Sequence, residues 1–147
     1  MRDLISNEQI VHLGNLTLSG TTPALSSYVD LSGFNACTIV MVNNTITDAG
    51  TTAGFTATLQ ESADTTGAGA GTVATTDTVG GANTIAVTAD DADNTVAGGI
   101  GYVGGDRYVG LSVVGTTGTA ADVSVYAILG KPHKAPTTFI GTAVART

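Results

Sequence analysis

The segment Arg107-Tyr108-Val109-Gly110-Leu111-Ser112-Val113-Val114 alternates between two kinds of side chain. Val109, Leu111 and Val113 occupy one set of alternate positions, and mostly smaller or more polar residues occupy the other. Successive side chains of an extended chain point to opposite faces, so this alternation predicts a β-strand with one buried side. We expect Val109, Leu111 and Val113 to face a hydrophobic core.

The same period of two recurs on both sides of this segment. It is clear at Phe55–Gln60 and Val123–Leu129, and weaker at Gln9–Leu18, Ser27–Leu31, Cys37–Val42, Thr72–Val79 and Thr84–Thr88. Turn-forming clusters separate these segments at Thr47–Gly50, Thr65–Gly71, Gly80–Asn83 and Gly115–Thr119. The chain has no capped apolar stripe with the helical period. Short strands joined by such turns predict an all-β protein, a single β-sandwich of jelly-roll or immunoglobulin-like type.

The length and the two ends of the chain predict its domain organisation. A chain of 147 residues corresponds to one domain. We expect residues 9–130 to form the sandwich, residues 1–8 an N-terminal arm and residues 131–147 an extended C-terminal arm. Pro132 and Pro136 lie at the start of the second arm. Proline has no N–H for a sheet ladder, so the sheet is expected to end before them.

The charge is distributed unevenly along the chain, which has a formal net charge of −7. All twelve acidic residues lie in the first 130 residues, and the only basic residues of that part are Arg2 and Arg107. An acidic body repels phosphate, so binding to nucleic acid is not expected. The longest apolar run, Cys37–Val42, is far shorter than the roughly 20 residues that cross a bilayer, so no membrane partner is expected either.

The C-terminal arm has the opposite charge. It carries three basic residues and no acidic one. It also contains two neighbouring apolar residues, Phe139 and Ile140. One interpretation is a frayed terminus, since chain ends often fray. The other is an arm that lies on a neighbouring subunit and binds it through Lys131, Lys134, Phe139, Ile140 and Arg146.

Asp90, Asp91 and Asp93 form the densest group of carboxylates in the sequence. Calcium binds six to eight oxygen atoms, and neighbouring carboxylates in a loop can supply some of them. The spacing lacks the glycine and the glutamate of an EF-hand loop. A solvated acidic turn explains the group more simply, and these residues are only weak metal candidates. No cofactor is predicted.

A Gly-x-Gly-x-x-Gly pattern occurs at Gly99–Gly104. In a dinucleotide-binding fold this pattern follows a strand and begins a helix. Here β-type alternation follows it instead. A glycine-rich loop that leads into the strand at 107–114 is therefore the better interpretation.

Residues for catalysis are scarce. His12 and His133 lie far apart in the sequence, and no nucleophile or zinc-protease motif is present. We interpret His12 as a half-buried structural residue. The single cysteine, Cys37, excludes a disulfide within the chain. The protein is therefore not expected to be an enzyme.

Three segments resemble a known family: Gly101–Val109, Leu59–Asp64 upstream of it and Ala127–Pro132 downstream. Together they resemble small structural proteins of tailed bacteriophages, which are similar to capsid cement or decoration proteins. The resemblance covers about residues 20–136. It implies a component of the virion with no catalytic residues.

The resemblance also implies a location and partners. The protein is expected to be made in the host cytoplasm and to bind the outer surface of the phage head, where it stabilises the shell. Its partners are then the major capsid protein and further copies of itself. A homotrimer follows by analogy with the local three-fold points of such shells. The alternatives are a tail, neck or head-fibre component, or a calcium-dependent surface-binding module.

Overall fold

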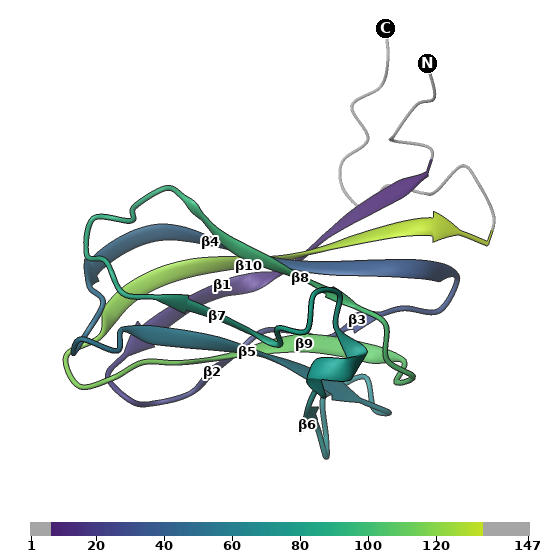
Figure 1. The fold of residues 1–147 in the computed structure, drawn as a ribbon, viewed down its shortest axis with the longest axis horizontal. Helices are drawn as coiled ribbons and strands as arrows, with labels where there is room; N and C mark the ends of the chain where they lie inside the picture. Colours follow the sequence, from purple (N-terminus) through teal and green to yellow (C-terminus); the bar gives the residue numbers. More distant parts are fainter. Residues whose placement is uncertain (1–6, 134–147) are drawn as a thin grey trace, which may run out of the picture.

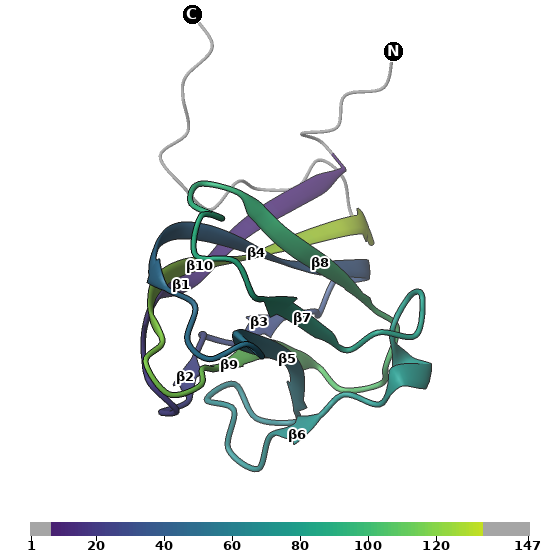
Figure 2. The same cartoon turned by 60° about the vertical axis from the view of Figure 1, so that its left-hand side comes forward.

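The protein is a sandwich of two antiparallel β-sheets (Figures 1 and 2). This computed structural model describes residues 7–133. The first sheet contains, in spatial order, β1 (Glu8–Ser19), β10 (Ala120–Pro132), β4 (Phe34–Asp48) and β8 (Val96–Tyr102). Within the described residues no helix has the length and apolar character needed to span a bilayer. The predicted all-β sandwich is confirmed.

The second sheet is built around two neighbouring strands, β9 (Tyr108–Val114) and β5 (Phe55–Ser62). Two short strands pair with the free side of β9, namely β2 (Ala24–Leu25) and β3 (Val29–Asp30). Two more pair with the free side of β5, namely β6 (Gly71–Thr72) and β7 (Thr84–Val87). The sheet is therefore four strand positions wide, like the first.

The order of the strands distinguishes between the two predicted types of sandwich. The chain passes from β1 in the first sheet to β2 and β3 in the second, and returns for β4. It then crosses for β5, β6 and β7, returns for β8, crosses for β9 and returns for β10. This repeated crossing is the topology of a jelly roll. An immunoglobulin fold instead joins several consecutive strands within one sheet.

The core lies between the two sheets and consists of inward-facing residues from both. Val109 is 0% exposed, and Leu111 and Val113 are also buried, so the predicted inward face of the 107–114 segment is confirmed. Across the sandwich they face a layer that includes Ile39 and Met41. Burying each such side chain contributes roughly 1.5–3 kcal/mol to folding.

Two of the sequence predictions for the middle of the chain are wrong. Residues 72–79 do not form a continuous strand, because the 3₁₀ turn η1 (Thr75–Asp77) interrupts them. The chain crosses there from the edge of the second sheet to the edge of the first, where the Val79 N–H donates to Gly101 O at 2.8 Å. Such a crossing needs a turn that alternation does not encode.

The glycine-rich segment is the second wrong prediction, because Gly99–Tyr102 belongs to strand β8 and is not a loop. Glycine is uncommon in strands, so composition alone predicts a turn. In the structure a Cβ atom at Gly101 would lie 2.9 Å from Val79 Cγ2. Glycine at this position allows that side chain to pack closely on the edge of the sheet.

The predicted limits of the strands also differ from the observed ones. The weak strand at Ser27–Leu31 is reduced to the two residues of β3. Strand β10 continues through Lys131 to Pro132, which pairs with Phe34. Proline is tolerated there because it is the last residue of the strand. Lys131 therefore belongs to the sandwich and not to the arm, whose residues 134–147 lie outside the described range.

Candidate functional site

A cleft of about 430 Å³ opens at one end of the sandwich. We call it the terminal cleft, because the first described residues of β1 and the last of β10 lie at the same end. Residues 31–37 form one wall and residues 102–107 the other. The cleft is lined by Leu31, Ser32, Phe34, Asn35, Ala36, Cys37, Tyr102, Val103, Gly104, Gly105, Asp106 and Arg107.

Tyr102 fixes the second wall of the terminal cleft. Its side chain is 5% exposed, and its hydroxyl donates to Glu61 Oε2 at 2.5 Å. The same oxygen accepts the Asp106 N–H at 2.9 Å. Burial, reinforced by the bond to Glu61, raises the pKa of Tyr102 well above its ordinary value. The loop after β8 is thus tied to strand β5 through one phenol group.

Arg107 and Asp30 join the two walls. Arg107 donates from Nε to Asp30 Oδ1 at 2.8 Å and from Nη2 to Asp30 Oδ2 at 2.6 Å. The Ser32 N–H also donates to Asp30. These bonds, above all the one from Arg107, hold the pKa of Asp30 well below its usual range. Arg107 therefore forms an ion pair within the chain, and its charge is already neutralised.

The cleft also presents apolar side chains among its polar and glycine residues. Leu31 and Phe34 line it from one side, and Val103, 61% exposed, lies on the other. Cys37 is buried behind them, and burial raises the pKa of its thiol to about 12. A thiol with that pKa stays protonated at neutral pH and is a poor nucleophile. The arrangement favours binding of an apolar group over covalent chemistry.

Asp106 is the one charged residue of the cleft without a partner among the described residues. Its backbone N–H is bonded to Tyr102, whereas its exposed carboxylate forms no bond within residues 7–133. The terminal cleft thus combines apolar walls with one free negative charge. A ligand with an apolar group and a nearby positive charge fits both features.

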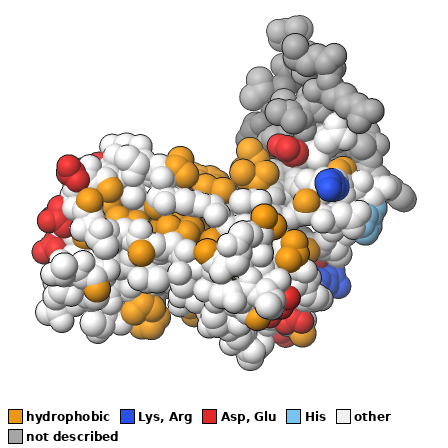
Figure 3. Space-filling model, viewed as in Figure 1, with side chains coloured by type: hydrophobic (Ala, Val, Ile, Leu, Met, Phe, Trp, Pro, Cys, Tyr) orange, Lys and Arg blue, Asp and Glu red, His pale blue; other side chains and the backbone are white. Residues whose placement is uncertain are grey.

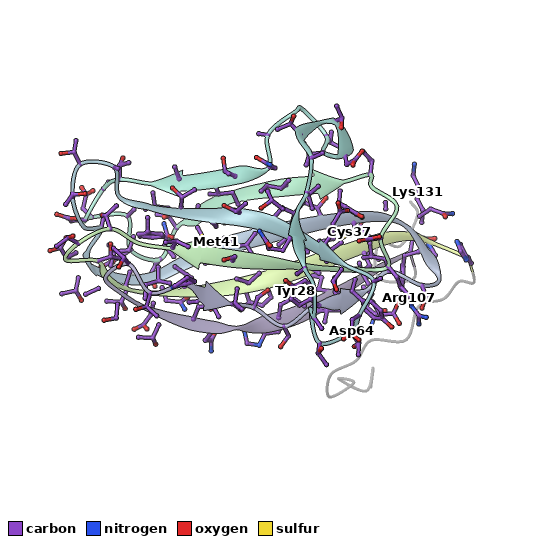
Figure 4. All side chains as sticks on the ribbon, turned by 90° about the horizontal axis from the view of Figure 1, so that it is seen from below. Tyr28, Cys37, Met41, Asp64, Arg107 and Lys131 are labelled. Atoms are coloured by element: carbon purple, nitrogen blue, oxygen red, sulfur yellow. The ribbon has the colours of Figure 1, made fainter. Side chains whose placement is uncertain are left out.

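Of the predicted arm residues, the structure describes only Lys131. It is exposed and has a φ of +51°, next to the end of β10. Figure 4 shows Lys131, Cys37 and Arg107 toward the same end of the sandwich. The other four lie outside the described residues: Lys134, Phe139, Ile140 and Arg146.

The chain leaves the described region beside the terminal cleft. The His133 N–H donates to Gly33 O at 2.8 Å, and the His133 ring lies 2.9 Å from Asn35 Oδ1. Asn35 is itself a lining residue. The last described residue is therefore held at the rim of the cleft.

The weak metal candidates lie at the opposite end of the sandwich, which we call the acid end (residues 46–54, 87–95 and 115–119). Asp90 accepts the Ala49 N–H at 2.8 Å, and Asp93 accepts the Ile46 N–H at 2.5 Å. Asp91 has an exposed side chain. Within residues 7–133, no three His, Cys, Asp or Glu side chains gather in a way that could hold a metal ion.

His12 is exposed on the outer face of the first sheet, so its interpretation as a half-buried residue is wrong. Its ring stacks on Tyr126 with the ring centres 5.0 Å apart, and Nε2 lies 3.0 Å from Asn15 Oδ1. Outward-facing residues of β1 and β10 form this contact. The two histidines are not brought together.

Sequence reasoning missed the terminal cleft as a site. Its second wall lies within Gly101–Val109, a segment with a glycine-rich pattern and a family resemblance but no binding motif. The pairing of Tyr102 with Glu61 spans 41 positions, and that of Arg107 with Asp30 spans 77. No local pattern encodes contacts at that separation.

Comparison with known proteins adds no relative to this description. No protein-family model matches the chain, and no curated protein matches it in sequence. A functional proposal for the chain therefore rests on its residues and its geometry.

Proposed function

We propose that the protein is a decoration, or cement, protein of a bacteriophage head, which binds the outer surface of the capsid and stabilises it. The observation that carries this proposal is the position of the chain ends. Glu8 pairs with Gly130, so β1 begins and β10 ends side by side. Both terminal segments therefore start from one end of a rigid jelly roll, where they can reach the same partner.

The charge distribution supports docking through this end. The described residues include eleven acidic side chains and only two basic ones, Lys131 and Arg107. Figure 3 shows one group of acidic side chains at the end of the sandwich far from the chain ends, and further acidic side chains closer to the chain ends. An orientation with the acid end pointing outward keeps these charges away from packaged DNA, which would repel them.

The outer faces of the sheets suit repeated contacts between copies. The outer face of the second sheet includes small uncharged residues such as Thr56, Thr58 and Ser112. Such side chains lose little entropy when they are buried. Jelly rolls are used in viral capsid proteins as well as in lectins, which is an argument by analogy of fold. The partners are then the major capsid protein and other copies of the chain, with a homotrimer as the expected assembly.

Deletion of residues 134–147 tests the proposal. Shells of the phage whose genome encodes the chain are mixed with the intact or the shortened protein and sedimented. We expect the shortened protein to keep its β-sheet circular dichroism spectrum and to stay in the supernatant. As a control for charge at the opposite end, the Asp91→Lys variant of the intact chain is expected to sediment with the shells.

Two results would contradict the proposal. The first is equal coating of shells by the intact and the shortened protein. The second is a location of the protein in the virion other than the head. Gold-labelled antibodies should mark the head evenly. Labelling of the tail, the neck or isolated fibres would instead favour a tail, neck or head-fibre component.

A further inference from the structure

We propose that the terminal cleft holds the chain's own C-terminal segment, residues 134–147, with Phe139 and Ile140 between its walls, in the protein before assembly. This inference does not rest on the phage assignment. It rests on where the chain leaves the sandwich, on what lines the cleft and on the chemistry of the segment that follows.

The exit point places the segment next to the cleft. Pro132 pairs with Phe34, and His133 is held by Gly33 and Asn35 at the rim. Strand β4 lies between β10 and β8, so the wall that follows β8 is two strand spacings from β10, roughly 10 Å. Phe139 is the sixth residue after His133, and an extended chain of that length reaches about 20 Å. The segment is therefore long enough to cross between the two walls.

The chemistry of the cleft matches the segment. The apolar pair Phe139-Ile140 would be buried against the exposed surface of Leu31, Phe34 and Val103. Exposed apolar walls of this kind are typical of binding surfaces. The segment carries two basic residues and no acidic one, whereas the Asp106 carboxylate in the cleft has no partner among the described residues. Lys134 and Arg146 give the segment the charge opposite to that of Asp106.

The occupant is the segment of the same chain and not that of a second copy. A tethered segment has an effective concentration in the millimolar range, far above the usual concentration of free copies. Seating its own segment covers the apolar walls until a partner binds.

Disulfide trapping in the full-length chain tests this seat. Val103→Cys places a thiol in the cleft, and Ile140→Cys places one in the segment. In the matched control, Ile10→Cys replaces Val103→Cys. Ile10 is also exposed and lies near the same end, but on the other side of β10 from the cleft. An extended chain of seven residues, from His133 to Ile140, spans roughly 23 Å. Val103 follows β8, two strand spacings from β10, and Ile10 lies in β1, one spacing from β10. Cys37 is buried and does not compete.

Under mild oxidation we expect the Val103→Cys/Ile140→Cys protein to form a disulfide within one chain at least about tenfold faster than the control, as a preferred seat requires. Phe139→Ser in the same background should abolish that difference. Mapping of the linked peptides identifies the bond, and the rate should not depend on protein concentration. Equal rates in the two proteins, or disulfide-linked dimers as the main product, would overturn the proposal. Both readouts use the isolated protein, so they are independent of attachment to shells.

Discussion

The two ends of the sandwich use their polar side chains in opposite ways. At the acid end, the Asp90 and Asp93 carboxylates accept backbone N–H groups of β4 and of the residue after it. The Thr119 hydroxyl, which is buried, donates to Ala49 O at 2.9 Å and accepts the Thr116 N–H at 2.9 Å. These loops are closed by bonds among themselves. At the terminal end, Tyr102 and Arg107 fix two walls with an open cleft between them.

This difference indicates where a partner can bind. The Asp90 and Asp93 carboxylates hold loops to the fold, and a ligand that displaced these bonds would remove their stabilisation, about 1.5–3 kcal/mol for a bond to a charged group. The acid end is therefore part of the fold, although its carboxylates first suggested a metal site. The terminal end exposes apolar walls at no such cost. Four sets of substitutions test this contrast.

Glycine-to-alanine substitution should give the largest difference in unfolding free energy between the acid end and the end with the terminal cleft. Gly54, at the acid end, has a φ of +65°, and an added Cβ would lie 1.9 Å from Val87 O. Backbone cannot move aside as a side chain can, so we expect Gly54→Ala to lower the free energy of unfolding by about 3 kcal/mol or more. Urea denaturation measures the change.

Gly33→Ala is the control at the terminal end. Gly33 also has a positive φ, +91°, but an added Cβ would meet no atom within 4 Å. Only the backbone preference is then lost, and we expect a cost of about 1 kcal/mol. Equal costs for the two variants would mean that the acid end is no more tightly packed than the terminal end.

The hydroxyl of Tyr102 should carry the next largest effect. Tyr102→Phe leaves the Glu61 carboxylate and the Asp106 N–H without this partner, and we expect a loss of about 1–2 kcal/mol in unfolding free energy. Tyr126→Phe is the matched control, because the Tyr126 hydroxyl lies on a partly exposed face. An unchanged midpoint of urea denaturation for Tyr102→Phe would show that the second wall of the cleft keeps its stability without the bond from Tyr102 to β5.

Strands β9 and β8 show what the sequence could and could not predict. Strict alternation over residues 107–114 was enough to identify β9 and its buried face, because each inward residue there is a large aliphatic one. The sandwich followed from several such segments. Strand β8 was missed because three of its seven residues are glycine, which reads locally as a turn. Its pairing with β4 maintains the extended conformation, and pairing partners are not visible in one strand.

The candidate site was less predictable than the fold. Phe139 and Ile140 were recognised as an apolar pair, but the cleft proposed to receive them arises where residues 31–37 meet residues 102–107. Those walls come together only when β4 and β8 pair and the β8–β9 loop folds back onto Tyr102. A site formed by long-range pairing leaves no motif in the chain.

The acid end offers a third, smaller test. Asp90→Ala removes the acceptor for the Ala49 N–H, and we expect a loss of about 1 kcal/mol in unfolding free energy. Asp90→Asn keeps an oxygen acceptor and should change stability much less. Calcium should leave the melting temperature of the wild-type protein unchanged, because a ligand that binds only the folded state must raise it. A calcium-dependent rise that Asp90→Asn abolishes would instead support the calcium-dependent module.

The smallest expected effect is the pH dependence of the Arg107–Asp30 pair. Arg107 lowers the pKa of Asp30 in the folded protein, so the unfolded chain binds a proton at Asp30 more readily. The stabilisation is therefore complete above the ordinary aspartate pKa, near 4, and decreases as the pH falls below it. The two side chains are 56% and 39% exposed, so salt should weaken the interaction as well. We expect the difference in urea midpoint between wild type and Asp30→Asn to be largest at neutral pH and low salt, and to shrink at pH 2.5 or in 1 M salt. A difference that stays constant with pH would mean that the charge of Asp30 does not contribute to it.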